Sequence, residues 1–117
     1  MSLLDTSVLV ELLRKKIYEF ADISVITLIE VLRGVKAKKR KKVKDLIERS
    51  FNVIGLDNKV IEAYCNLYDK LKRNREMISD ANLLIAATAV SHGLKLKTKN
   101  RKHFERLKKH GLEVVFV

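Results

Sequence analysis

The stretch Met1-Ser2-Leu3-Leu4-Asp5-Thr6-Ser7-Val8-Leu9-Val10 decides the fold. Its first apolar run is too short for a helix, so it predicts a buried strand that ends at Asp5. Thr6 and Ser7 then mark the start of a helix. In open parallel α/β sheets, ligands bind beyond the carboxyl ends of the strands, and this pattern puts the Asp5 carboxylate there. The alternative is that Asp5 only caps the helix that follows.

Short apolar runs alternate with helical patterns along the rest of the chain. Alternating and apolar runs predict further strands at 22–26, 51–54, 94–97 and 113–117. Helical spacing and end signals predict helices after Thr6, up to Arg33, and at 36–49, 57–71, 82–90 and 101–109. The helix at 82–90 is apolar almost all round, so we expect neighbours on more than one of its sides. Five strands alternating with helices indicate an α/β fold with a parallel sheet covered on both faces.

Length and composition describe a globular chain with an excess of positive charge. The 117 residues contain no linker or repeat, so residues 1–117 are expected to form a single domain. Hydrophobic residues make up 47% and charged residues 33%, which excludes a disordered chain. The formal net charge of +11 predicts a polyanionic partner such as RNA, although an acidic protein segment would satisfy the same field.

The cysteine count and the lengths of the apolar runs indicate the cellular compartment in which we expect the protein. Cys65 is the only cysteine, so no intrachain disulfide can form and a reducing, cytoplasmic compartment is expected. It falls beside the apolar face of the 57–71 helix, where we expect an inert core position. No signal peptide precedes Asp5, and no apolar stretch approaches the ~18 residues of a membrane span, so no membrane partner is expected.

Two further polar positions stand in apolar surroundings. Glu30 lies in the apolar segment 25–32, where burying an unpaired carboxylate would be costly. It therefore either turns to solvent or faces a cation. Thr98-Lys99-Asn100 follows a predicted strand, so it either joins the same edge as Asp5 or forms an ordinary strand-to-helix turn. No glycine-rich nucleotide loop and no zinc-ligand spacing is present.

A basic run consists of Lys38, Lys39, Arg40, Lys41 and Lys42. A solvated helix face is the simplest account of it, a phosphate-binding surface is the second, and a nuclear-localisation signal is the third. Aromatic residues do not interleave with the run and the chain has no tryptophan, so base stacking there is not supported.

Four stretches together carry a resemblance to a known family. They are Leu3-Leu4-Asp5-Thr6-Ser7, Ile29-Glu30 before Arg33-Gly34, Leu84-Ile85-Ala86-Ala87-Thr88-Ala89, and Thr98-Lys99-Asn100-Arg101-Lys102-His103-Phe104. In order, spacing and length the chain resembles a PIN-domain protein of the VapC toxin type, over essentially its whole length. The Asp-Thr-Ser opening is weak by itself, whereas its combination with the later stretches is specific.

The resemblance implies a three-layer α/β/α sandwich with a five-stranded parallel sheet, and a metal-dependent endoribonuclease. A divalent cation, Mg²⁺ or Mn²⁺, would hold the clustered acids ionised at the carboxyl edge and activate water for attack on phosphate. Asp5 carries over as the first acid and principal ligand, and Glu30 as the second. Thr6 or Ser7 would support the loop. An acidic antitoxin segment and a second copy of the chain are the implied partners.

The third acid of the family is missing from this sequence. An aspartate usually stands three residues before the Ile of Ile-Ala-Ala, and that position is Asn82, which keeps a carbonyl oxygen but has no charge. Asp80 would lie about 200° round a helix from Asn82, so it reaches the metal only if the helix begins after it. Otherwise Asp80 or Ser79 is the helix cap. The lost charge fits either a natural attenuation or one engineered to let a toxic nuclease be produced.

The final turn of the family site offers Asn100 and His103, with Thr98 beside them. Asn100 occurs at this position in the family, whereas His103 stands where an acid is frequent and weakens the negative cluster. Magnesium prefers charged oxygen ligands, so a site with only Asp5 and Glu30 ionised should bind it less tightly.

The expected function is a ribonuclease toxin of reduced activity, with Asp5, Glu30, Asn82 and Asn100 as its catalytic residues. The alternative is a PIN-like module whose metal site has decayed and which binds RNA or protein without cleavage. Asn82 favours the alternative, while Asp5, Glu30 and Asn100 favour the enzyme. A phospho-acceptor signalling domain fits less well, because it would need paired acids on the first strand.

Overall fold

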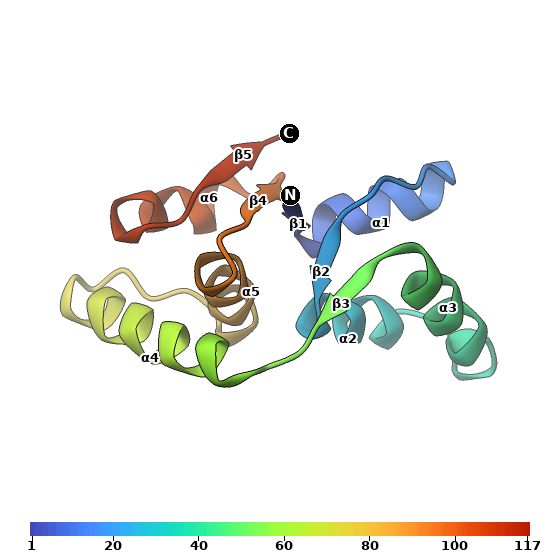
Figure 1. The fold of residues 1–117 in the computed structure, drawn as a ribbon, viewed down its shortest axis with the longest axis horizontal. Helices are drawn as coiled ribbons and strands as arrows, with labels where there is room; N and C mark the ends of the chain where they lie inside the picture. Colours follow the sequence, from blue (N-terminus) through green and yellow to red (C-terminus); the bar gives the residue numbers. More distant parts are fainter.

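Five parallel strands form one sheet in the order β3-β2-β1-β4-β5 (Figure 1). The computed structural model describes all residues, 1–117. The strands are β1 (Ser2–Leu4), β2 (Asp22–Ser24), β3 (Asn52–Ile54), β4 (Lys95–Thr98) and β5 (Val114–Phe116). The predicted parallel five-stranded sheet is therefore confirmed, with β1 at its centre between β2 and β4.

Helices cover both faces of this sheet. One face carries α1 (Thr6–Lys15), α2 (Val25–Arg33) and α3 (Ala37–Ser50). The other carries α4 (Asn58–Arg73), α5 (Asp80–Ser91), α6 (Arg101–Phe104) and the 3₁₀ helix η1 (Glu105–His110). Figure 1 shows the first group on the right and the second on the left, which confirms the three-layer α/β/α sandwich. None of these helices combines the length and the apolar character that crossing a membrane requires.

The sheet separates two apolar clusters, because successive side chains of a strand point to opposite faces. On β1, Leu3 belongs to the cluster under α4 and α5, whereas Leu4 belongs to the cluster under α1 and α2. Ala86, Ala87 and Ala89 of α5 are fully buried, and α5 packs against α4, α2 and β4. The expectation of neighbours on several sides of this helix is thus confirmed.

Local hydrogen bonds set where several elements end. The predicted strand at 22–26 stops at Ser24, because the Ser24 Oγ accepts the Ile26 N–H at 3.0 Å and starts α2. The predicted helix at 101–109 begins as α6 and continues as the 3₁₀ helix η1 to His110. Cys65 of α4 is exposed, so the expected core position was wrong.

Candidate active site

Asp5 extends directly from the central strand. Its backbone is extended, its N–H donates to the Lys97 carbonyl at 2.9 Å, and its own carbonyl accepts the Val8 and Leu9 N–H groups of α1. The residue is only 5% exposed. Its carboxylate makes no capping hydrogen bond to α1, so the alternative in which Asp5 serves only as a cap is wrong.

The Asp5 carboxylate is held by two hydroxyl groups. Asp5 Oδ2 accepts from the Thr98 hydroxyl at 2.7 Å and from the Ser7 hydroxyl at 3.0 Å. The β1–β4 register pairs Leu4 with Lys97, which puts the fully buried Thr98 beside Asp5. Thr98 Oγ1 in turn accepts the Asn100 N–H at 3.0 Å. Because both hydroxyls bind Oδ2, Oδ1 is left for a ligand.

Glu30 turns toward the start of α1 and does not extend freely into solvent. The Thr6 hydroxyl donates to Glu30 Oε1 at 2.6 Å, and the Thr6 and Thr27 hydroxyl oxygens lie 3.2 Å apart. Thr27 is fully buried, and Glu30 is half-buried. Thr6, the residue after Asp5, therefore holds the Glu30 carboxylate in place. The two acids are thus positioned relative to each other where α1 packs against α2.

Neither Asp5 nor Glu30 has a lysine or arginine partner among the ion pairs of the chain. Of the lysines on and after β4, Lys97 lies 3.6 Å from Glu19, and Lys99 pairs with Glu11. In a chain of net charge +11, two carboxylates that no side-chain cation neutralises fit an added divalent cation. Their oxygen donors are the type that Mg²⁺ and Mn²⁺ take.

Asn82 and Asp80 occupy different surroundings on the first turn of α5. Ser79 is the cap of this helix, since its hydroxyl accepts the Asn82 N–H at 3.2 Å. Asp80 Oδ1 accepts from the Tyr64 hydroxyl at 2.7 Å, so its carboxylate faces α4. This hydrogen bond, with some burial, raises the pKa of Tyr64 to about 12. Asn82 is half-buried, on a helix that packs against α2, which carries Glu30.

No group of three or more His, Cys, Asp and Glu side chains in the chain is arranged to hold a metal ion. A metal-binding set built on Asp5 and Glu30 would have to be completed by neutral oxygen donors. Asn82 carries a neutral amide oxygen on the first turn of α5. The Asn100 side chain has another task, because its Oδ1 accepts the His103 N–H at 3.3 Å and caps α6. His103 is half-buried one turn further on.

Comparison with known proteins agrees with this geometry, since residues 2–110 match the PIN domain. The chain belongs to the PIN-domain family. This PIN domain is 38% identical over 115 residues to Ribonuclease VapC1 of Methanocaldococcus jannaschii, and the alignment covers 96% of this chain and 85% of that protein. The resemblance to VapC-type PIN domains is thereby confirmed.

Solved structures show the same fold. VapBC2 from Rickettsia felis, bound to a DNA fragment from its promoter, superposes with a TM-score of 0.84 at 24% identity, covering 99% of this PIN domain and 98% of that chain. A toxin–antitoxin complex from Klebsiella pneumoniae superposes with a TM-score of 0.75 at 26% identity, covering 98% and 96%.

Sequence reasoning did not find every residue that shapes the site of this PIN domain. Thr27 was not predicted, although it precedes Glu30 by three residues and so lies on the same helix face. The hydrogen bond from Tyr64 to Asp80 was not predicted either. A threonine one turn before an acid in an apolar helix was the available signal for Thr27. Nothing in the sequence signalled the partner of Asp80.

Proposed function

We propose that this PIN domain is a divalent-metal-dependent endoribonuclease and the toxin of a toxin–antitoxin pair, acting as a single domain in the cytoplasm. The observation that carries the proposal is the pair of carboxylates at the carboxyl edge of the sheet, Asp5 and Glu30, which no cation of the chain neutralises. The hydroxyl of Thr6, the residue after Asp5, donates to Glu30. The ribonuclease name of the archaeal relative and the toxin–antitoxin neighbour support the proposal.

Asp5, Glu30 and Asn82 would hold the metal, Mg²⁺ or Mn²⁺. When bound, such an ion lowers the pKa of coordinated water and stabilises negative charge on the scissile phosphate. The chain's own contribution is to fix the acids before substrate arrives. Thr98 and Ser7 orient Asp5 through Oδ2, and Thr6 orients Glu30 through Oε1. Asn100 holds Thr98 and the start of α6 in place, which shapes the edge of the site.

RNA would bind along the basic run on α3. Lys38, Lys39, Lys41 and Lys42 are exposed and take no part in ion pairs. Arg40 differs, because its Nε donates to the Leu32 and Val35 carbonyls and closes the turn between α2 and α3. The four lysines are therefore available to phosphate, and the excess of positive charge would also attract an acidic antitoxin segment. A homodimer is expected from the resemblance to VapC toxins.

The decisive test compares the unaltered chain with Asp5→Asn and Asn82→Asp. Metal binding is titrated by calorimetry, and cleavage of RNA is measured at one salt concentration. Asp5→Asn should abolish cleavage in a folded protein. Asn82→Asp restores the missing charge with almost no change in volume, so it should tighten metal binding and raise cleavage. Full cleavage by Asp5→Asn would exclude Asp5 as the principal ligand.

The second candidate function is a module that binds without cutting, and the absence of a three-acid cluster favours it. Asn82→Asp separates the two functions. If the added carboxylate improves neither metal affinity nor cleavage, the site is not catalytic. Asp80 does not offer a third ligand, because α5 begins at Asp80 and its carboxylate accepts from the Tyr64 hydroxyl on α4.

A further inference from the structure

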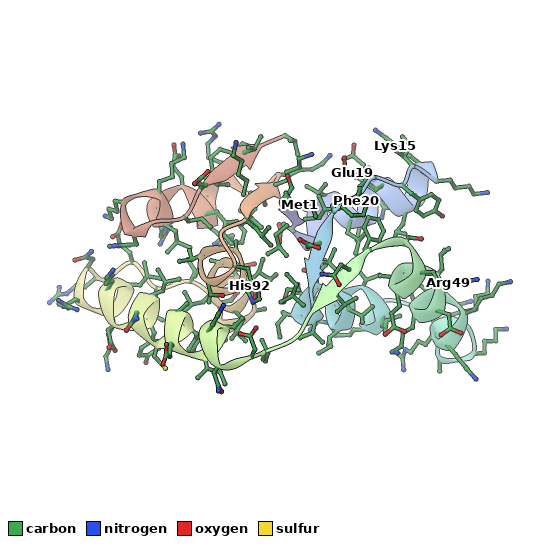
Figure 2. All side chains as sticks on the ribbon, viewed as in Figure 1. Met1, Lys15, Glu19, Phe20, Arg49 and His92 are labelled. Atoms are coloured by element: carbon green, nitrogen blue, oxygen red, sulfur yellow. The ribbon has the colours of Figure 1, made fainter.

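A second polar site lies at the amino ends of β2 and β3, at the edge of the sheet opposite Asp5. A pocket of about 500 Å³ opens there between the segment before β2 and the end of α3. Its polar and aromatic lining residues are Phe20, Asp22, Glu48, Arg49, Ser50, Phe51 and Asn52. Figure 2 shows Phe20 just before β2 and Arg49 near the end of α3. No residue of the metal site contributes to this pocket.

The pocket contains a buried carboxylate with an unused oxygen. Asp22 is 7% exposed, and the β2–β3 register pairs it with Asn52, whose Nδ2 donates to Asp22 Oδ1 at 3.0 Å. Asp22 has no cationic partner in the chain. Asp22 Oδ2 has no hydrogen-bond partner in the chain. It is also not fully enclosed, so it remains accessible from the pocket that Asp22 lines. A buried carboxylate is costly unless donors meet it, and a ligand would supply them.

An exposed aromatic residue, Phe20, also lines this pocket. Phe20 is 90% exposed, although Ala21 and Phe51, which line the same pocket, are almost completely buried. A phenyl ring in water beside an open pocket offers a face on which a flat ligand can stack. The site therefore fits a planar molecule with N–H donors on one edge.

Guanine meets these requirements. Its Watson–Crick edge presents two adjacent N–H donors to a carboxylate, whereas adenine, cytosine and uracil each place an acceptor beside a donor there. Arg49 lines the same pocket and offers a guanidinium to a phosphate. Glu48, the other acid of the lining, is paired with Lys44 at 2.8 Å. We propose that this pocket binds a guanine base carrying a 5′-phosphate, either as a free nucleotide or within an RNA chain.

A guanidinium group from a partner protein would also be flat and rich in donors. The electrostatics favour the nucleotide, because a chain of charge +11 repels a cationic segment and attracts a phosphate. Arg49 at the pocket adds to that preference. On α3, Arg49 lies seven residues after Lys42, on the same side of the helix. A strand of RNA that follows the lysines of α3 would thus arrive at this pocket.

The test measures binding of guanosine 5′-monophosphate by calorimetry in EDTA, so that it is independent of the metal site and of cleavage. We expect binding about tenfold tighter than that of adenosine or inosine monophosphate, since inosine lacks the exocyclic amine. Asp22→Asn keeps the acceptor for Asn52 but turns a donor toward the ligand, and it should abolish the preference. Phe20→Ala, at an exposed position, should weaken all nucleotides, while Asp69→Asn on α4 is the charge-matched control.

Comparison with an oligouridine that carries one guanine identifies the source of the base. Tighter binding of the oligonucleotide than of the monophosphate assigns the guanine to RNA, and equal binding assigns it to a free nucleotide. Equal affinity for guanosine and adenosine monophosphates would overturn the proposal. Binding of N-acetyl-arginine amide in place of guanosine monophosphate, lost in Asp22→Asn, would overturn it in favour of a protein partner.

Discussion

Replacing Thr98 with valine tests how the site holds its first acid. Valine has nearly the shape of threonine, so no cavity opens in this fully buried position. Two hydrogen bonds disappear, one donated to Asp5 Oδ2 at 2.7 Å and one accepted from the Asn100 N–H at 3.0 Å. A bond to a charged group contributes about 1.5–3 kcal/mol and a neutral one about 0.5–1.5 kcal/mol. The expected loss in the free energy of unfolding is therefore about 3 kcal/mol.

Urea unfolding at neutral pH gives this loss directly, and melting should shift by about 4 °C for each kcal/mol in a chain of this size. Thr98→Ser keeps the hydroxyl and is the matched control, which should lose about 1 kcal/mol through the missing methyl group. Metal affinity should fall in Thr98→Val and persist in Thr98→Ser. Equal stability and equal Mn²⁺ affinity of the Thr98→Val and Thr98→Ser variants would show that the hydroxyl group is not what orients Asp5.

Three other predictions concern charge. Replacing the four lysines of residues 38–42 with glutamine should reduce the slope of log affinity for single-stranded RNA against log salt by about 3, and an unchanged slope would make the run a solvated face. An absorbance titration should find a tyrosine with a pKa of about 12, absent in Tyr64→Phe and shifted down in Asp80→Asn. The Val60 N–H, and then His92, lower the pKa of Asp57 below its ordinary 3.8. Its charge therefore stabilises the fold above that pH, and the stability difference from Asp57→Asn should disappear as the pH falls through the folded-state pKa.

Periodicity was sufficient for the layout of the sheet and helices, because each strand and helix of this chain has a local pattern. The buried Asp5 at a strand end was predictable for the same reason. The direction of Glu30 was not, since its partner Thr6 lies 24 residues away on another helix. The partner of Asp80 was equally hidden, because Tyr64 reaches it across the α4–α5 packing. A sequence pattern shows that a side chain is polar in apolar surroundings, and only the packing of helices shows what it meets.

The separation of Asp5 and Thr98 along the chain has a consequence for biosynthesis. The two side chains meet across β1 and β4, yet they stand 93 positions apart in the sequence. During translation β1 cannot pair with β4 until late, because β4 is made long after β2. Until then, the acid that would bind the metal lacks its Thr98 partner and has only Ser7 beside it. The site is complete only after Thr98 has been made, so the order of synthesis itself would delay the proposed ribonuclease activity.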